Sequence, residues 1–287
     1  MQIRRVEIVV NPASGSVPAD AAAQAEQLLA ELGLEGRVST LAGDFDACLK
    51  EAVSAKPDVL AVLAGDGTAR AAAELCGPEG PVLAPLPGGT MNMLPRAIYG
   101  DRPWREALSE ALSKGVARAV GGGEVDGRLF LVAAILGAPA LWAPAREAVR
   151  AGKFRLAALR ARRALNRAFT GRLRYSFDEA VRGKAEALAF ICPLTSRGMD
   201  NDAQALEAAA LDPSGAAEVF RLGAQALLGA WRNDGSVAVS SCRTARVWAS
   251  AGIPALLDGE LVRLDRSAWV LYRPSVVRML TLPDEAA

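Results

Sequence analysis

Residues 59–68 read VLAVLAGDGT, and this stretch decides the fold of the first part of the chain. The apolar run 59–63 suits a strand that is buried on both faces, as in a parallel sheet. Gly65-Asp66-Gly67-Thr68 follows as a turn that leads directly into a helix over 69–76. A strand, a glycine turn and a helix in this order predict one unit of an α/β sheet.

The same alternation extends through the first 115 or so residues. Strands are predicted at 6–10, 38–41, 59–63 and 81–86, and helices at 19–32, 45–55, 69–76, 91–98 and 104–114. This order predicts a parallel sheet with helices on both faces. After three glycines at 121–123, short strand-like segments bounded by Gly and Asp replace the alternation, at 129–132, 173–177, 187–192, 236–240, 245–249 and 270–272. We therefore expect an α/β domain over 1–120 and a largely antiparallel domain over 121–273.

The composition excludes several kinds of chemistry. The chain has 287 residues, 33 Lys and Arg against 32 Asp and Glu, and no histidine. A Ser-His-Asp triad, a Cys-His pair and an imidazole-bound zinc are therefore impossible. Proton transfer must rest on carboxylates, Tyr, Lys or Cys, and the simplest metal is an oxygen-bound one such as Mg²⁺. Four widely spaced cysteines with no CxxC favour a reduced, cytoplasmic setting.

One segment departs from this charge balance. Residues 146–174 contain ten basic residues and a single acid, and apolar residues at 154, 158, 161, 165 and 168 share one helical face. We expect a basic amphipathic helical insert at about 141–170 that contacts an anionic membrane surface; the alternative is a solvated helix packed on its domain. Few aromatic residues accompany the charges, so no nucleic-acid partner is expected. The arginines expected at the membrane are Arg155, Arg160, Arg163 and Arg167.

Three loops of small and polar residues follow strands of the predicted parallel sheet, at 11–15, 65–68 and 87–92. Open α/β sheets bind ligands at this edge. Small residues let the backbone approach a ligand, and hydroxyls and helix-start amides donate to anionic oxygens. Together the loops predict a phosphate-binding site. The chain contains no GxxxxGK[ST] motif, and no GxGxxG follows its first strand.

The loops Asn11-Pro12-x-Ser14-Gly15, 65–68 and 89–92, with Asp258-Gly259-Glu260, resemble motifs of the diacylglycerol kinase catalytic-domain family. That family holds bacterial lipid kinases, sphingosine kinases and ceramide kinases, and the motifs occur here in its order over nearly the whole chain. The resemblance implies a nucleotide-binding first domain of NAD-kinase or flavodoxin type and a C-terminal β-sandwich. It also implies an active site in the cleft between them and a final segment, about 274–287, that packs back on the first domain.

The resemblance further implies site residues. Asp66 and Glu260 are the candidates for the general base, a choice that the sequence leaves open, and either could instead be a structural turn carboxylate. Asp212 is implied as a metal ligand, and the implied cofactors are ATP and Mg²⁺. The chain departs from the family at Arg70-Ala71, where a carboxylate is usual, so a cation replaces it near the phosphates. The implied ATP contacts are Asn11, Ser14, Gly15, Thr40, Gly65, Gly67, Thr68, Gly89, Thr90 and Asn92.

These residues lead to an expected function. We expect an ATP-dependent lipid kinase that phosphorylates the primary hydroxyl of a membrane lipid alcohol, either diacylglycerol or a ceramide or sphingoid lipid. The alternatives are a soluble-substrate kinase similar to NAD kinases and a catalytically inactive lipid- or nucleotide-binding protein. We expect a cytoplasmic protein associated peripherally with the inner face of the membrane. The oligomeric state, with a homodimer among the options, is left open by the sequence.

Overall fold

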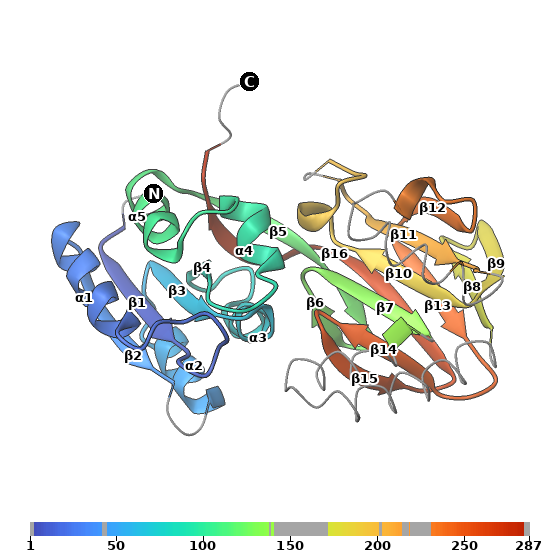
Figure 1. Ribbon diagram of the computed structural model, residues 1–287, viewed down its shortest axis with the longest axis horizontal. Coiled ribbons are helices and arrows are strands. Elements are labelled where there is room, and N and C mark those ends of the chain that lie inside the picture. The colour runs from blue at the N-terminus through green and yellow to red at the C-terminus, as the bar shows by residue number, and fades with distance from the viewer. Residues whose placement is uncertain are drawn as a thin grey trace. The chain divides into compact units, whose positions relative to one another are not determined.

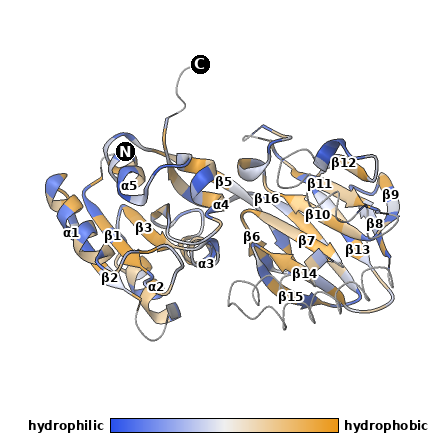
Figure 2. Ribbon diagram, viewed as in Figure 1, coloured by the Kyte–Doolittle hydropathy of each residue, from blue (hydrophilic) through white to orange (hydrophobic). Residues whose placement is uncertain are grey.

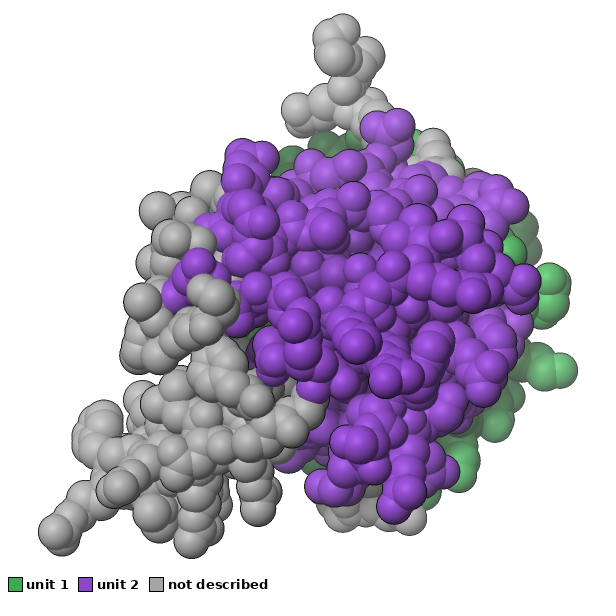
Figure 3. All heavy atoms as spheres, turned by 90° about the vertical axis from the view of Figure 1, so that its right-hand side faces the viewer, with its two compact units in different colours: residues 1–121, 274–287 green, residues 122–273 purple. Residues whose placement is uncertain are grey.

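The computed structural model of the chain describes residues 3–41, 45–137, 139–140, 172–200, 203–213, 218 and 231–283. The chain forms two compact units (Figures 1 and 3). Unit 1 comprises residues 1–121 and 274–287, and unit 2 comprises residues 122–273. The basic helical insert expected at 141–170, with its arginines, lies outside the described residues. In the described part of the chain, no helix is both long and apolar enough to span a bilayer.

Unit 1 is an open α/β domain. Its parallel sheet has the order β2-β1-β3-β4, and the end of strand β16 adds to β4 in parallel through Met279 and Leu83. The α/β class predicted from the sequence is therefore confirmed. Its elements are β1 (Arg5–Val10), α1 (Ala21–Glu31), β2 (Glu35–Thr40), α2 (Phe45–Ser54), β3 (Val59–Ala64), α3 (Asp66–Cys76), β4 (Val82–Pro87), α4 (Met93–Tyr99) and α5 (Trp104–Lys114).

The centre of the unit 1 sheet is fully buried. Every residue of β3 is inaccessible to solvent, as expected for a parallel strand covered on both faces. Residues of α1 and α5 share one core cluster with alternate residues of β1 and β3, and α2 and α3 contact each other and the sheet. Figure 2 shows the resulting hydrophobic colouring of β1 and β3.

The helix expected from residue 69 begins earlier, at Asp66. Gly65 is the extended residue before the helix (φ −83°, ψ 169°), and Asp66 and Gly67 form its first turn. A carboxylate in a first turn interacts favourably with the helix dipole, which offsets the weak helix propensity of glycine there. The predicted turn is thus the helix N-terminus itself.

Unit 2 is built from two antiparallel sheets. One has the order β16-β13-β8-β9, with β5 paired to β16 and β6, and the other has the order β12-β11-β10-β7-β14-β15. Buried residues from both sheets form one core cluster, so the predicted β-sandwich is confirmed. The strands are β5 (Val116–Val125), β6 (Arg128–Phe130), β7 (Ala133–Gly137), β8 (Leu173–Phe177), β9 (Val181–Ala185), β10 (Ala187–Ile191), β11 (Leu206–Leu211), β12 (Val237–Cys242), β13 (Thr244–Trp248), β14 (Ile253–Leu257), β15 (Glu260–Leu264) and β16 (Ser267–Thr281); short 3-10 helices are η2 (Pro193–Thr195) and η3 (Trp231–Asn233).

The three glycines at 121–123 lie inside β5 rather than in a linker between strands. Gly123 has a packing reason: a Cβ there would lie 1.9 Å from the ring of Phe130, its partner on β6. Strand β16 is also longer than the predicted segment 270–272. It runs for 15 residues, from its pairing with β13 in unit 2 to its pairing with β4 in unit 1.

Candidate active site

The predicted loops of unit 1 follow strands that end at one edge of the sheet. The parallel register pairs Val10 with both Thr40 and Leu63, and Ala64 with Pro87. The residues that follow β1, β3 and β4 therefore emerge at the same, carboxyl edge. Thr40, the last residue of β2, is exposed there. This is the edge at which open α/β sheets bind ligands.

The first loop is joined to the third by two hydrogen bonds. The backbone amide of Ser16 donates to the carbonyl of Gly88 (3.1 Å), and its hydroxyl donates to the carbonyl of Gly89 (2.8 Å). A Cβ on Gly15 would lie 3.0 Å from the hydroxyl of Thr90. The first loop is therefore fixed against the third.

The second and third loops approach each other so closely that glycine is required. A Cβ on Gly89 would lie 2.7 Å from the Cα of Gly65, and one on Gly88 would lie 2.7 Å from the amide nitrogen of Ala64. Both clashes are with backbone, which cannot move aside without distorting the sheet edge. Gly67 differs, because a Cβ there would meet nothing within 4 Å. Packing explains Gly88 and Gly89, whereas Gly67 leaves open space over the start of α3.

The Asp66 carboxylate links two helix N-termini. It lies in the first turn of α3 and accepts hydrogen bonds from the amides of Met93 (3.2 Å) and Leu94 (3.0 Å) at the start of α4. Nothing in the spacing of these residues predicts this contact. It gives Asp66 a positioning role, because the carboxylate holds the third loop and α4 in place. A catalytic role for Asp66 stays a prediction.

Two asparagines predicted to contact ATP shape the loops. Asn92 adopts the left-handed conformation (φ 49°) and its side-chain oxygen accepts a hydrogen bond from the amide of Gly89 (2.7 Å). The side-chain oxygen of Asn11 accepts one from the amide of Ala13 (3.1 Å). In both cases the amide nitrogen of the side chain is the group left to donate to a ligand.

All ten predicted ATP contacts thus lie on the loops, the strand ends and the first turn of α3 at this edge of unit 1. Each is exposed or half-buried except Gly89, which is buried against Gly65. A cavity of about 310 Å³ borders the first and third loops. It lies within unit 1, and its two arginines and its tryptophan belong to none of the motifs in the sequence. Its lining is Ser16, Pro87, Asn92, Arg96, Gly100, Asp101, Arg102, Pro103 and Trp104.

The remaining candidate base, Glu260, belongs to unit 2. It is the exposed first residue of β15, directly after a two-residue turn in which Asp258 (φ 47°) and Gly259 (φ 90°) are left-handed. Asp258 accepts hydrogen bonds from the three consecutive amides of residues 131–133, at 2.7, 2.9 and 3.0 Å. The motif's aspartate is therefore a structural anchor of this turn, and the role of Glu260 as base stays a prediction.

Asp212, the implied metal ligand, lies just after β11 and forms an ion pair with Arg172. Within the described ranges, no group of three or more acidic or cysteine side chains is placed to hold a metal ion. Mg²⁺ in phosphoryl-transfer sites is commonly bound by one or two carboxylates together with substrate phosphates. Asp66 is the carboxylate among the glycine loops that fits this mode, and the assignment of Asp212 stays a prediction.

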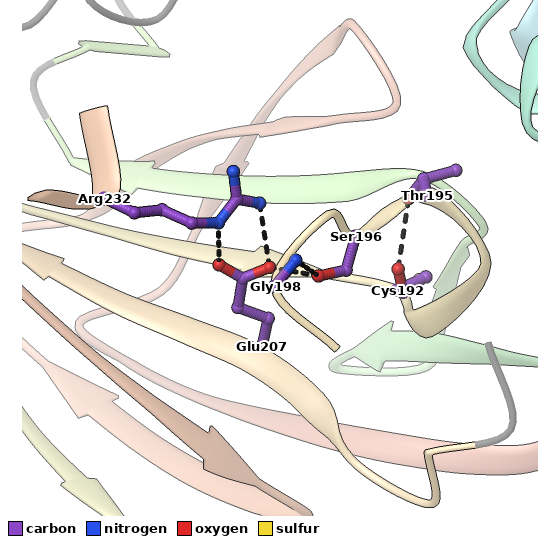
Figure 4. A network of polar contacts seen from close by, with 6 residues as sticks. All are labelled: Cys192, Thr195, Ser196, Gly198, Glu207 and Arg232. Carbon is purple, nitrogen blue, oxygen red and sulfur yellow. Dashed lines mark hydrogen bonds and ion pairs between the residues drawn. The ribbon is translucent and has the colours of Figure 1, made fainter. Parts of the chain in front are cut away.

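Unit 2 also holds a buried polar network that the sequence did not reveal (Figure 4). Glu207 on β11 is 1% exposed, accepts a hydrogen bond from the hydroxyl of Ser196 and forms an ion pair with Arg232, with 2.9 Å between Nη2 and Oε2. Burial alone would raise the pKa of Glu207, but the hydrogen bonds from Arg232 and Ser196 and the charge of Arg232 lower it below its usual value. Glu207 is therefore a satisfied structural carboxylate.

The parallel sheet and its joined glycine loops define unit 1 as an α/β domain with a ligand-binding edge. Residues 5–125 match the family described as the diacylglycerol kinase catalytic domain. This range contains all three loops. This segment of the chain is similar to the catalytic domain of diacylglycerol kinases.

Individual proteins are also similar to this chain. The chain is 31% identical over 134 residues to a diacylglycerol kinase of Bacillus subtilis (strain 168), a match that spans 45% of this chain and 44% of that protein. The fold is similar to that of a diacylglycerol kinase from Bacillus anthracis str. Sterne, with a TM-score of 0.71 at 15% identity and full coverage of both chains. A further structure from the same strain gives a TM-score of 0.73 at 16% identity, also with full coverage of both chains.

Proposed function

We propose that this protein is an ATP-dependent lipid kinase, which transfers the γ-phosphoryl group of ATP to the primary hydroxyl of a membrane lipid alcohol. The observation that carries the proposal is the joining of three glycine loops at one sheet edge, inside the segment that matches the kinase family. The family match over residues 5–125 supports the reaction class, and the loop geometry supports where the nucleotide binds.

The loops have the chemistry that a triphosphate needs. The N-terminus of α3 carries the positive end of a helix dipole, and the open space at Gly67 lets a phosphate approach its amides. The hydroxyls of Ser14, Thr68 and Thr90 are placed on the three loops as further donors. Mg²⁺ bound with the nucleotide would neutralise the charge that develops on the phosphoryl oxygens. In phosphoryl transfer, such positioning and electrostatic stabilisation supply most of the rate.

The acceptor hydroxyl must lose its proton as the phosphoryl group moves. Asp66 is our first candidate for this base, because it is fixed among the loops by two backbone amides and is half-buried. Each of its oxygens has a second lone-pair site that these hydrogen bonds leave for the acceptor. Glu260 is the second candidate, and comparing Asp66→Asn with Glu260→Gln decides between them.

Diacylglycerol is the acceptor that the family match and the Bacillus subtilis relative favour. Ceramide or a sphingoid base offers the same primary alcohol. Such substrates reside in a bilayer, so we propose that the enzyme acts in the cytoplasm as a peripheral protein at the inner face of the membrane. The charge of the segment 146–174 supports this location.

Radiolabelled ATP with a panel of acceptors tests the proposal. Diacylglycerol, ceramide and sphingosine would be presented in mixed micelles, with NAD as the soluble acceptor. We expect label in diacylglycerol above the others. Label in NAD alone would identify a soluble-substrate kinase, and ATP binding without any labelled product would identify an inactive binding protein; either result would overturn the proposal.

A further inference from the structure

One outer face of the unit 2 sandwich gathers several basic side chains beside two tryptophans. Side chains of β8 alternate: Leu173, Tyr175 and Phe177 are buried in the core, whereas Arg174 and Ser176 lie on the outer face. The same alternation applies to β9, β13 and the first part of β16, the strands that pair with β8 or with its neighbour. These four strands form one outer sheet face (Figure 1, right).

Register brings cations and tryptophans together on this face. Arg174 lies opposite Lys184 on β9 and opposite Trp248 on β13. Ser176 lies opposite Arg182 and Arg246, and Arg246 lies opposite Trp269 on β16. The four cations are exposed, and Trp269 is 47% exposed. We call this set the basic–aromatic face, and its members are Arg174, Arg182, Lys184, Arg246, Trp248 and Trp269.

The cations of this face have no acidic partners among the described residues. Elsewhere in unit 2, Arg172, Arg232 and Arg273 each form an ion pair. Arg246 instead makes two cation–π contacts: its Cζ lies 5.7 Å from the ring centre of Trp248 and 5.5 Å from that of Trp269. Four neighbouring positive charges repel one another, so an external anionic group would stabilise them.

The face is also hollowed beside its charges. A cavity of about 430 Å³ is lined by Arg172, Arg174, Lys184, Trp248, Ala249 and Ser250. A phosphate-bearing headgroup that enters this hollow would meet guanidinium and ammonium donors on one side and an indole on the other. Indole side chains prefer the boundary between water and lipid, because one end of the ring system is apolar and the other donates a hydrogen bond.

We propose that the basic–aromatic face docks on the surface of an anionic lipid bilayer. Cations alone would fit any polyanion, but two tryptophans beside them match the headgroup region, where aromatic rings and basic residues both gain free energy. The choice of a bilayer over a nucleic acid rests on the proposed function, since a lipid kinase must reach a bilayer. This surface lies on described strands, and all of its members except Arg174 lie outside the basic segment at 146–174.

Vesicle sedimentation with the full chain tests this docking. The probe is a pair of vesicle preparations, one of phosphatidylcholine alone and one in which phosphatidylglycerol replaces part of it. We expect wild-type protein to sediment with the anionic vesicles only, and Arg174→Gln/Lys184→Gln to lower the partition coefficient about 25-fold, about fivefold per charge. The matched control is Arg128→Gln/Arg263→Gln, which removes two exposed charges from other strands of unit 2.

A second pair on the same face, Arg182→Gln/Arg246→Gln, tests the proposal if the first pair does not fold. Circular dichroism measures whether each variant is folded. Equal losses for the face and control pairs, or wild-type binding that ignores phosphatidylglycerol, would overturn the docking proposal. The proposal would also be overturned if the face variants lost binding to a DNA duplex but still bound the anionic vesicles as wild type does. Phosphoryl transfer to diacylglycerol in mixed micelles without anionic lipid, measured on the same variants, separates the two proposals. If wild type shows no transfer, the kinase function is wrong. The docking proposal would still be supported if vesicle binding falls for the face variants and not for the control pair.

Discussion

Both units place aspartate beside glycine where strands end, but they use it differently. In unit 2, Asp126 and Asp258 each precede a glycine and are left-handed, with φ of 46° and 47°, and each carboxylate accepts backbone amide hydrogen bonds from another part of the chain. In unit 1, the Gly65-Asp66-Gly67 segment begins a helix, and its neighbouring loops are joined at a sheet edge. An Asp-Gly pair therefore marks either a turn or a site. The candidate site differs from the turns in its surroundings: Ser and Thr hydroxyls, the start of a helix, and the carboxyl edge of a parallel sheet.

The largest effect that we expect is on catalysis, when the Asp66 carboxylate is removed. Asp66→Asn should lower the rate of phosphoryl transfer about 10²–10⁴-fold, because an amide cannot accept the acceptor's proton. The fold should persist, because the Asn oxygen still accepts an amide hydrogen bond from α4. Initial rates in mixed micelles, calorimetry with ATP and thermal unfolding measure the three properties. A rate close to wild type, with Glu260→Gln inactive, would assign the base to Glu260 and leave Asp66 as a positioning residue.

For Asp258 we expect the reverse: a substitution should lower stability through the loss of a structural contact. Asp258→Ala removes the acceptor of three amide hydrogen bonds to residues 131–133, and should lower the free energy of unfolding by about 2–4 kcal/mol. Urea unfolding monitored by tryptophan fluorescence measures the change. Asp258→Asn is the matched control and should cost less, because Asn keeps an acceptor and tolerates the left-handed conformation. An unchanged midpoint for the alanine variant would contradict the anchoring role.

Alanine substitutions at two glycines of unit 1 distinguish an effect on packing from an effect on ligand binding. Gly89→Ala places a methyl group 2.7 Å from the Cα of Gly65 and should destabilise the protein by about 1–3 kcal/mol. Gly67→Ala meets no neighbour, so stability should stay level or rise by about 0.4–1 kcal/mol. ATP affinity should nevertheless fall for Gly67→Ala, because the methyl group fills the space over the helix start. If calorimetry shows that Gly67→Ala binds ATP with wild-type affinity, the phosphates do not bind over the start of α3.

The smallest expected effect concerns the buried carboxylate of unit 2. The pKa of Glu207 is lowered in the folded protein, so its ionised form stabilises the fold above its usual pKa of 4.5. This contribution should disappear as the pH falls from 4.5 through the folded pKa. Glu207→Gln should show a shallower loss of stability over that acidic window, measured by urea unfolding at a series of pH values. Parallel curves for the two proteins would show that Glu207 does not titrate with unfolding.

The sequence predicted the strands and helices of unit 1 to within a few residues. Parallel strands covered on both faces are continuous apolar runs, and β3 is the clearest example. It also predicted which loops share an edge, because strand order in an α/β sheet determines where strand ends emerge. The third loop's dependence on Asp66 and Asn92 was not predictable, since hydrogen bonds to backbone amides leave no mark in residue spacing.

Unit 2 was predicted less completely. Strands β5, β7, β9, β11, β14 and β15 were not among the predicted segments. The charged residues Arg182 and Lys184 on β9 are more typical of a loop, and β11 contains Glu207 within an alanine-rich run. The signal that could have found Glu207 is its position in a strand that is otherwise apolar, since a lone buried carboxylate needs a cationic partner. That partner, Arg232, is 25 residues away, and only the fold brings the two together.

The passage of β16 into unit 1 has a consequence for biosynthesis. Residue 279 pairs with β4, and the hydroxyl of Tyr99 donates to the carbonyl of Leu280 (2.7 Å). On the ribosome, the nascent first unit therefore has an open edge on β4 until all of unit 2 has been synthesised. An exposed strand edge invites pairing with other chains. A recombinant fragment limited to residues 5–125 would keep that open edge permanently and should self-associate.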